Sequence, residues 1–355
     1  MSALFSPLTI RSLELKNRLV VSPMCQYSAT DGFANDWHLV HLGSRAVGGA
    51  ALVIAEATAV SPEGRISPGD LGLWSDEHID FLKRITTFLH AQGSHAGIQL
   101  AHAGRKSSVQ VSWKGGEQLY PETGGWQTVA PSAVAFKDGD PVPQMLSLDD
   151  IQRIITNFKD AAERALKAGF DVVELHGAHG YLIHEFLSPL SNFRTDAYGG
   201  SFENRIRFLC EITKAVRTVW PATLPLFVRI SATEWVENGW TEEDSIRLST
   251  VLKTLDVDLI DCSTGGNISG VRIPLTPMYQ MPFAERIRRD AGILTGAVGL
   301  INTAEEAESI IAGGKADLVL MARELLRDPY FAYRAADELG DGAQWPVQYE
   351  RAKRK

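Results

Sequence analysis

The chain has 355 residues, of which 45% are hydrophobic and 22% are charged, so its composition is that of a globular protein rather than a disordered or fibrous one. A formal net charge of −8 disfavours nucleic acid and anionic membrane surfaces as partners. No apolar run reaches the roughly 18 residues of a membrane span, and the first residues lack the pattern of a signal peptide. The three cysteines are too scattered for a disulfide framework or a structural zinc site. We therefore expect a cytoplasmic protein.

Eight short apolar runs, each ending in small or polar residues, alternate with stretches of helical periodicity. Near-continuous apolar runs are typical of strands buried on both faces of a parallel sheet. The runs occupy residues 18–23, 51–56, 96–102, 170–176, 225–231, 257–262, 292–296 and 316–321. Eight such strand–helix units predict an α/β fold, a single TIM barrel or (β/α)8 domain over residues 1–355, with a doubly wound open sheet as the alternative.

Helix boundaries are marked by capping signals between these runs. Ser147 stands three residues before Asp150, a spacing that resembles a capping box and predicts a helix start. Gly169 supplies a stop at the far end of the apolar stripe that follows, where a left-handed residue is needed. Thr241 and Thr303, each followed by acidic residues, predict two further helix starts by the same logic.

Two connections are longer than a strand–helix unit requires. Residues 103–146, rich in Gly, Pro and Trp, predict an insertion after the third strand that caps the barrel. Residues 177–222 form a second long connection, after the fourth strand. Loops at the carboxyl ends of barrel strands carry function, so we expect these two to build a lid and a wall of the site. The last residues, 340–355, are expected to form a C-terminal arm.

The most informative segment directly follows the fourth predicted strand. His176, His179 and Tyr181 stand within six residues, and Gly177 and Gly180 allow the tight turn that brings both imidazoles to the barrel mouth. Two imidazoles offer paired hydrogen-bond donors to one oxygen that gains negative charge, and the phenol is a possible proton donor. A metal site is the alternative, but it needs a third ligand. Packing or capping at a strand end is the other alternative.

The first predicted strand ends at a cysteine, Cys25. A thiol at the end of a barrel strand is a nucleophile, a neighbour that tunes a redox group, or a small buried hydrophobe. Cys210 falls in a predicted helix and Cys262 in a predicted strand, and we interpret both as structural.

Two polar side chains interrupt apolar strands. Arg229 needs an acceptor, which is either a bound anion, an electron-rich cofactor or a carboxylate remote in sequence. Gln99 both donates and accepts hydrogen bonds, which suits the amide-like edge of a ring.

The seventh and eighth strands end in small residues, at Gly296–Gly299 and at Ala322, with Arg323 next in sequence. Loops after these two strands form the usual phosphate site of a barrel, since small residues expose backbone N–H groups and arginine adds a bidentate cation. The chain has no dinucleotide fingerprint and no P-loop motif. A dinucleotide would therefore visit the site rather than occupy a domain of its own.

Taken together, these segments resemble the Old Yellow Enzyme family of FMN-dependent ene-reductases, in particular its thermophilic-like subclass. The matching motifs are Lys16-Asn-Arg18, Ser22-Pro-Met-Cys-Gln-Tyr27, Glu56-Ala-Thr58, Gln99-Leu-Ala-His-Ala-Gly-Arg-Lys106, His176-Gly-Ala-His-Gly-Tyr181, Asn192-Phe-Arg-Thr-Asp-Ala-Tyr-Gly-Gly-Ser201, Glu203-Asn-Arg205, Arg323-Glu-Leu-Leu-Arg-Asp-Pro329 and Gln348-Tyr-Glu-Arg351. Cys25 in the first strand-end motif and His179 in place of Asn point to the subclass. Ala322 departs from the Gly common before the phosphate-binding Arg, a change that keeps the backbone N–H.

The resemblance implies a role for each matched residue. The cofactor FMN, bound tightly but not covalently, would contact Ser22, Pro23, Met24, Cys25, Ala57, Gln99, Arg229, Ala322 and Arg323, with Cys25 tuning its potential. The substrate would contact Tyr27, His176, His179 and Arg351. The catalytic residues would be Tyr181, His176, His179 and Cys25, with no metal.

The implied enzyme is an NADPH dehydrogenase of the Old Yellow Enzyme type. With NADPH or NADH as reductant, it would reduce the C=C bond of α,β-unsaturated carbonyl compounds by ping-pong kinetics. Flavin N5 would deliver hydride to Cβ and Tyr181 a proton to Cα. A homodimer or homotetramer is implied, with Arg351 reaching the neighbouring site. The alternatives are a larger iron–sulfur flavin reductase, which three scattered cysteines and 355 residues oppose, a metal-dependent barrel lyase, and a non-catalytic flavin-binding barrel.

Overall fold

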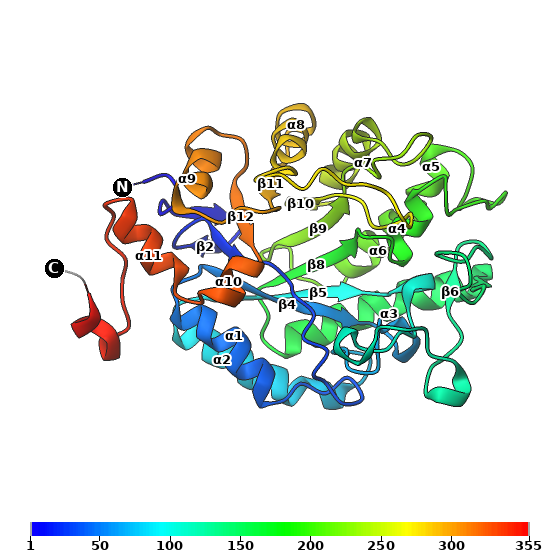
Figure 1. The fold of residues 1–355 in the computed structure, drawn as a ribbon, viewed down its shortest axis with the longest axis horizontal. Coiled ribbons are helices and arrows are strands. Elements are labelled where there is room, and N and C mark those ends of the chain that lie inside the picture. The colour runs from blue at the N-terminus through cyan, green and yellow to red at the C-terminus, as the bar shows by residue number, and fades with distance from the viewer. Residues whose placement is uncertain (1, 354–355) are drawn as a thin grey trace.

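The computed structural model describes residues 2–353, and its centre is a barrel of parallel strands (Figure 1). The barrel strands are β3 (Leu19–Val21), β4 (Leu52–Ala59), β5 (His95–Ala101), β8 (Val172–Gly177), β9 (Leu226–Ser231), β10 (Leu259–Ser263), β11 (Leu294–Ala297) and β12 (Leu318–Met321). They close in the order β10-β11-β12-β3-β4-β5-β8-β9. Each of the eight predicted runs supplies one of these strands. The predicted (β/α)8 barrel is therefore confirmed, and the open-sheet alternative is wrong.

The helices lie around the outside of the barrel (Figure 1). They are α1 (Asp36–Val47), α2 (Ile79–Ala91), α3 (Leu148–Lys167), α4 (Leu182–Leu187), α5 (Phe202–Arg205), α6 (Arg207–Arg217), α7 (Glu242–Thr254), α8 (Met281–Ala291), α9 (Ala304–Ala312), α10 (Arg323–Arg327) and α11 (Phe331–Glu338). The main core forms where their apolar faces meet the outer faces of the strands. No helix in residues 2–353 is both long and apolar enough to cross a bilayer.

The capping signals have the predicted effect on helix boundaries. The hydroxyl groups of Ser147, Thr241 and Thr303 each accept the backbone N–H three residues on, at the starts of α3, α7 and α9. Gly169 follows the end of α3 with a φ of 84°, a left-handed conformation that glycine adopts without steric cost. These helices therefore begin and end where local side-chain chemistry sets them.

One end of the barrel is filled by an antiparallel hairpin, β1 (Leu8–Ile10) and β2 (Leu13–Leu15). Its side chains Ile10, Leu13 and Leu15 form a second core cluster with interior strand residues, which include Val20 and Phe227. The opposite end, where the strands end in polar residues, is the end at which the candidate site lies.

The segment between β5 and α3 contains little regular structure. It includes short 3-10 helices at Gly104–Lys106, Ser112–Lys114 and Pro121–Thr123, and two parallel two-residue strands, β6 (Val129–Ala130) and β7 (Gln144–Met145). Arg194, in the connection after β8, donates to the carbonyl oxygens of Pro131 and Leu146 at 3.1 and 2.6 Å. The two long connections are therefore in direct contact with each other.

Candidate active site

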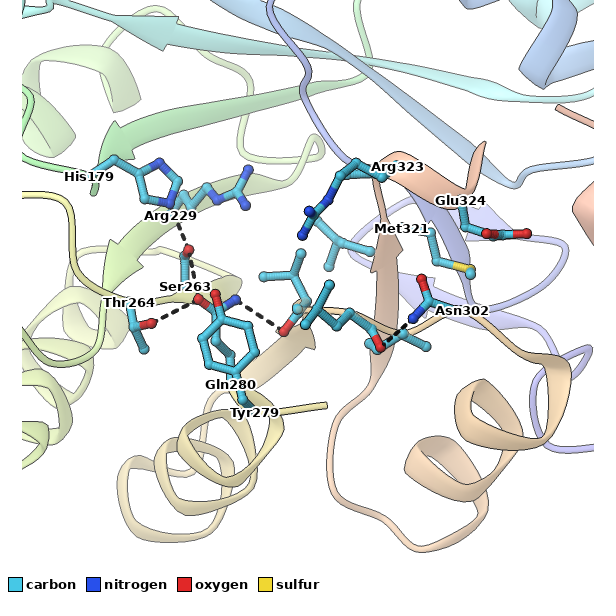
Figure 2. Close-up of a pocket in the computed structure, with 16 residues that line it drawn as sticks. His179, Arg229, Ser263, Thr264, Tyr279, Gln280, Asn302, Met321, Arg323 and Glu324 are labelled. Carbon is cyan, nitrogen blue, oxygen red and sulfur yellow. Dashed lines mark hydrogen bonds between the residues drawn. The ribbon is translucent and has the colours of Figure 1, made fainter. Parts of the chain in front are cut away.

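A cavity of about 290 Å³ lies at the carboxyl ends of β9 to β12 (Figure 2). The predicted site residues His179, Arg229, Ala322 and Arg323 line it. Its other polar lining residues are Ser263, Thr264, Tyr279, Gln280, Asn302 and Glu324. The cavity thus occupies the region that the sequence indicates as a phosphate site, after the seventh and eighth strands.

The β11–β12 side of the cavity has the features of an anion cradle. Within residues 2–353, Arg323 has no carboxylate within ion-pair distance, although it faces the cavity. Gly299 has a φ of 116°, and a Cβ there would come within 2.8 Å of Gln280 Nε2. Both the backbone conformation and the space beside Gln280 therefore favour glycine at this point of the cavity lining, which also holds Arg323.

Arg229 forms an ion pair with a carboxylate that is remote in sequence, one of the alternatives that the sequence left open. Its Nε lies 3.1 Å from Oδ2 of Asp261, the residue paired with it on the neighbouring strand β10. Its Nη1 donates to Ser22 Oγ at 3.2 Å. Burial raises the pKa of Asp261 to about 6, although the charge of Arg229 opposes the shift. Because Arg229 also lines the cavity, the carboxylate holds the guanidinium in place without removing it from a ligand's reach.

Gln99 also has a buried partner that the sequence analysis missed. Its Nε2 donates to Oε1 of Glu174 at 2.8 Å, across the β5–β8 pairing. Burial raises the pKa of Glu174 to about 8, and the charge of Asp261 adds to the shift. Glu174 fixes the amide group of Gln99, and the carbonyl oxygen of Gln99 remains available as an acceptor.

The predicted cofactor segment after β3 lies at the barrel mouth. Ser22 is buried, whereas Pro23, Met24 and Cys25 are partly exposed. Burial raises the pKa of the Cys25 thiol well above its usual value, so the group is a neutral thiol near pH 7. This protonation state argues against a nucleophilic role. Ala57 is buried in β4, and Cys210 and Cys262 lie in α6 and β10 as predicted.

The turn predicted to bring the two imidazoles together is present. The ring centroids of His176 and His179 lie 5.2 Å apart, and those of His176 and Tyr181 lie 5.0 Å apart. His179 has a φ of 60°, so the strand direction is broken between the two histidines. Burial, followed by the charge of Arg229, lowers the pKa of both histidines well below the usual value. Both rings are therefore neutral near pH 7.

A neutral imidazole has one N–H donor, and its neighbours decide which nitrogen carries it. The N–H of Ala178 donates to His176 Nδ1 at 3.4 Å, which leaves the proton on Nε2. His179 Nε2 lies 2.6 Å from Ser263 Oγ. Ser263 is a site residue that the sequence analysis missed.

Lys106 joins the segment after β5 to the histidine turn. Its Nζ donates to the carbonyl oxygens of His179 and Gly266 at 2.7 and 2.8 Å, and lies 5.1 Å from the centroid of the Tyr181 ring. Burial lowers the pKa of Lys106 to about 8. Burial raises the pKa of Tyr181 well above its usual value, so the phenol keeps its proton at neutral pH.

Three predicted substrate residues, Tyr27, His176 and Arg351, do not line the cavity, and neither does Tyr181. Tyr27 has a φ of 47°, and its ring meets the edge of Trp113 at a centroid distance of 6.0 Å. Arg351 is exposed, in the 3-10 helix Val347–Ala352. Figure 1 shows this C-terminal arm extending beyond α11, away from the barrel.

The neighbouring His184-Glu185 pair does not extend to a metal-ligand set: within residues 2–353, no three His, Cys, Asp or Glu side chains are grouped to hold a metal ion. Glu185 is instead a buried carboxyl whose Oε1 accepts the Arg105 N–H at 2.8 Å. Burial raises its pKa to about 8, against the opposing charges of Arg105 and Lys106.

Glu185→Gln is expected to change the pH dependence of stability. Because the folded state holds the Glu185 proton more tightly than the unfolded state, wild-type stability falls as pH rises from about 4.5 to 8. The variant lacks this contribution. As pH rises through that window, the difference in unfolding free energy between the variant and the wild type should therefore shift by a few kcal/mol in favour of the variant. Urea unfolding at several pH values measures the difference. The control is Glu163→Gln, at a partly exposed position on α3 where the carboxylate pairs with Lys167, and it should not reproduce this change. Parallel stability curves for the wild type and Glu185→Gln would contradict the account.

Barrel and cavity together have the architecture of a barrel enzyme with an anion site at the carboxyl ends of its last strands, and the comparisons with known proteins identify the family. Residues 3–341 match the model of the NADH:flavin oxidoreductase / NADH oxidase family, so the chain belongs to that family.

Similar proteins agree in name and in fold. An NADPH dehydrogenase of Geobacillus sp. (strain WCH70) is 52% identical over 353 residues, which is 99% of this chain and 98% of that protein. Morphinone reductase in complex with tetrahydroNAD is 28% identical with a TM-score of 0.77, over 97% of this chain and 92% of that one. 2-Naphthoyl-CoA reductase is 26% identical with a TM-score of 0.86, over 95% of this chain; the chain spans 52% of its length.

The protein is therefore an enzyme, an NAD(P)H:flavin oxidoreductase with FMN as its cofactor. The residues present fit that group. Arg323, which has no ion-pair partner in the described part of the chain, would hold the phosphate, and Arg229 and the amide of Gln99 would hold the electron-rich ring.

Arg323→Ala is expected to weaken FMN binding without unfolding the barrel. A charge-assisted hydrogen bond contributes about 1.5–3 kcal/mol, so the Kd for FMN should rise about 10- to 100-fold. Fluorescence titration of the apoprotein with FMN measures it. Arg289→Ala, at an exposed position near the end of α8 where the side chain pairs with Asp290 outside the cavity lining, should bind FMN as the wild type does. Equal Kd values for both variants would remove Arg323 from the phosphate site.

Proposed function

We propose that this enzyme reduces the C=C bond of α,β-unsaturated carbonyl compounds, with NADPH or NADH as the reductant. The observation that carries the proposal is the cluster of His176, His179 and Tyr181, in which the ring of His176 lies 5.2 Å from that of His179 and 5.0 Å from that of Tyr181, centroid to centroid. The relationship to a morphinone reductase and to NADPH dehydrogenases supports the same reaction class.

The two histidines bind the carbonyl oxygen of the substrate. Reduction of the conjugated alkene builds negative charge on that oxygen, and a buried N–H donor stabilises such charge by about 2.7–4 kcal/mol. His176 is oriented for this role, because the Ala178 N–H leaves its proton on Nε2. Neutral rings serve as donors without the cost of burying a second charge beside Arg229.

Tyr181 holds the proton that Cα receives. The ammonium group of Lys106, 5.1 Å from the ring centroid, favours the phenolate that remains after the proton leaves. Bound FMN supplies the hydride chemistry. The chain contributes position, oxygen binding and the proton.

The remaining predicted residues surround the cofactor and substrate. Ser22, Pro23, Met24 and Cys25 contact the flavin from the end of β3, and Cys25 acts as a neutral thiol that tunes its potential. Ala57, Gln99, Arg229, Ala322 and Arg323 hold the flavin, and Tyr27 contacts the substrate. The insertion of residues 103–146 caps the site, and its contacts with the connection after β8 support this role.

The working enzyme is a homodimer or homotetramer in which Arg351 enters the neighbouring subunit's site. Its exposed position on an arm that leaves the barrel supports this arrangement. Light scattering is expected to give two or four times the chain mass of 38.9 kDa. A monomer with full activity would contradict it.

The test of the proposed function is product analysis. Purified enzyme with FMN, NADPH and 2-cyclohexenone under nitrogen should consume one NADPH for each cyclohexanone formed. Reduction at the carbonyl, to cyclohexenol, would contradict the proposal. NADPH consumption that occurs only with oxygen would favour a flavin barrel with a different oxidant.

A further inference from the structure

The turn that carries the histidines is held in an uncommon backbone conformation. His179 and Gly180 follow one another with φ values of 60° and 72°, and left-handed geometry is unfavourable for a residue with a side chain. Surrounding side chains anchor the turn. Ser231 Oγ accepts the His179 N–H at 2.9 Å, and Lys106 Nζ donates to the His179 carbonyl oxygen at 2.7 Å.

The third anchor is His184. Its Nδ1 accepts the Gly180 N–H at 2.9 Å, which requires a lone pair on Nδ1 and therefore a proton on Nε2. That nitrogen lies 3.3 Å from Oε1 of Glu234, and both side chains are fully buried, at 0% and 1% exposure. His184 thus connects the backbone of the turn to one carboxylate.

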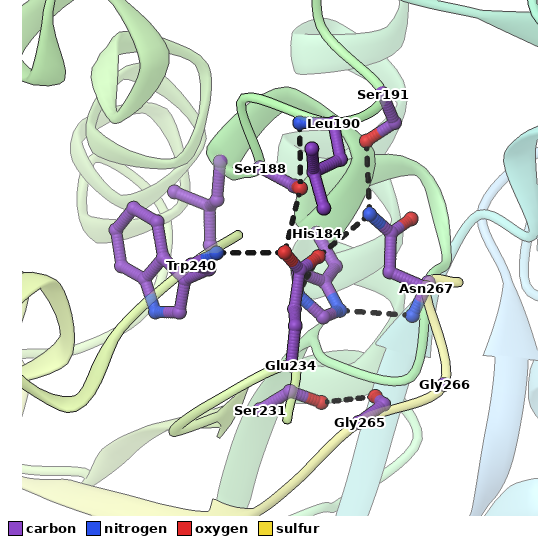
Figure 3. Close-up of polar contacts among 12 residues, drawn as sticks. His184, Ser188, Leu190, Ser191, Ser231, Glu234, Trp240, Gly265, Gly266 and Asn267 are labelled. Atoms are coloured by element: carbon purple, nitrogen blue, oxygen red, sulfur yellow. Dashed lines mark hydrogen bonds and ion pairs between the residues drawn. The ribbon is translucent and has the colours of Figure 1, made fainter. Parts of the chain in front are cut away.

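Glu234 accepts three hydrogen bonds in the interior, in addition to its 3.3 Å contact with His184 Nε2 (Figure 3). It accepts the Trp240 N–H at 2.7 Å, the Ser188 hydroxyl at 2.9 Å and Asn267 Nδ2 at 2.7 Å. Burial opposes ionisation, but His184, Trp240 and Ser188 lower the pKa of Glu234 to about 2. The carboxylate therefore stays charged and fixed over the working pH range, with little freedom to release His184.

The same network reaches the other wall of the site. Asn267 accepts from Arg105 through its backbone and side-chain oxygens, at 2.7 and 3.1 Å. Its neighbour Gly266 accepts from Lys106, the lysine that anchors His179. Glu234 is thus the shared support of the turn after β8 and of the loop after β10.

We propose that His184 and Glu234 are positioning residues for the reaction: Glu234 keeps the His184 proton on Nε2, so that Nδ1 fixes Gly180 and thereby the placement of His179 and Tyr181. The inference rests on the proposed function, in which these two side chains bind and protonate the enone. The side chains of His184 and Glu234 are fully buried, at 0% and 1% exposure, and neither lines the cavity. Their effect is therefore on the geometry of groups that touch the substrate, not on the substrate itself.

Two substitutions of His184 separate its two contacts. In His184→Asn, the amide oxygen stands near the Nδ1 position and still accepts from Gly180. In His184→Gln, the longer amide reaches Glu234 but leaves Gly180 without its acceptor. A misplacement of about 1 Å in a catalytic group costs on the order of 100-fold in rate. We expect kcat for cyclohexenone to fall about 100-fold in His184→Gln and by about 10-fold or less in His184→Asn. The rate of flavin reduction by NADPH should change little in either holoenzyme.

The matched control is His78, whose Nδ1 also accepts a backbone N–H, from Ser75, at the 3-10 helix that precedes α2. His78→Asn and His78→Gln should not differ from one another in kcat. Hydrogen exchange of the peptide 176–184 gives a readout independent of turnover: Gly180 should exchange faster in His184→Gln than in His184→Asn.

The outcomes distinguish the inference from the proposed function. A wild-type enzyme that leaves cyclohexenone unreduced, while the exchange difference at Gly180 persists, overturns the proposed function and keeps the anchor. Equal exchange and equal kcat in the two His184 variants overturn the positioning role. We expect the two variants to differ both in exchange at Gly180 and in kcat, with His184→Asn close to the wild type and His184→Gln impaired.

Discussion

Tyr181→Phe is expected to reduce the rate of enone reduction by about 100- to 10,000-fold, the usual contribution of a positioned general acid. The phenol lies in the turn after β8 beside His176, and its raised pKa keeps it protonated at neutral pH. Only the step that protonates carbon should suffer. Stopped-flow reduction of the enzyme by NADPH should be unchanged, and reoxidation by cyclohexenone should be slow.

The control is Tyr198→Phe. Tyr198 is a buried phenol that donates to Glu211 on α6 and accepts from Gln152 on α3, outside the cavity lining. This variant should reoxidise at the wild-type rate. If Tyr181→Phe also reoxidises within about threefold of the wild type, the proton comes from solvent and the assignment of Tyr181 is wrong.

Replacement of both His176 and His179 by Ala is expected to abolish measurable enone turnover while FMN remains bound. One donor to a developing oxyanion is worth about 100- to 1,000-fold in kcat, so loss of two leaves little catalysis. The KM for the enone should rise as well, because the same donors bind the carbonyl of the ground state. The visible spectrum of bound flavin and the steady-state rates measure the two effects.

A double variant of the surface pair His90 and His95 provides the control. Both histidines contact Asp171 rather than the cavity, at 2.7 and 3.4 Å, and their loss should leave turnover intact. If the His176–His179 variant instead loses its flavin, the pair serves the cofactor or the fold, and the oxyanion role is refuted.

The barrel could be predicted because its information is local. Each strand is a short apolar run, and each cap at Ser147, Thr241 and Thr303 lies within three residues of the group it satisfies. The turn after β8 was equally local, since Gly180, with a φ of 72°, directly follows His179. These features need no knowledge of the rest of the chain.

The missed residues depend on pairing between strands. Asp261 meets Arg229, and Glu174 meets Gln99, only through the register of adjacent strands. Asp261 and Glu174 are each an acidic residue inside an apolar run. That pattern could be seen in the sequence, but it does not indicate which side chain each residue contacts. Ser263 and Thr264, at the end of the sixth predicted strand, offered a weaker positional signal.

Other residues gave no usable signal. Gln280 reaches the cavity from a long connection without periodicity, and its contacts with Thr264 and the Val298 carbonyl appear only in three dimensions. Lys106 lies in a matched motif, but its contacts with the carbonyl oxygens of His179 and Gly266 depend on how three separate loops meet. Tertiary placement, not residue type, makes these groups part of the site.

The central claim is that FMN bound in one site is reduced by NADPH and is then reoxidised by an enone. A visible spectrum of the purified protein, recorded before and after anaerobic NADPH and again after 2-cyclohexenone, tests it most directly. We expect a yellow protein that is bleached by NADPH and regains its colour on addition of the enone. A protein that stays colourless after reconstitution with FMN, or a bleached protein whose colour does not return with the enone, would contradict the account.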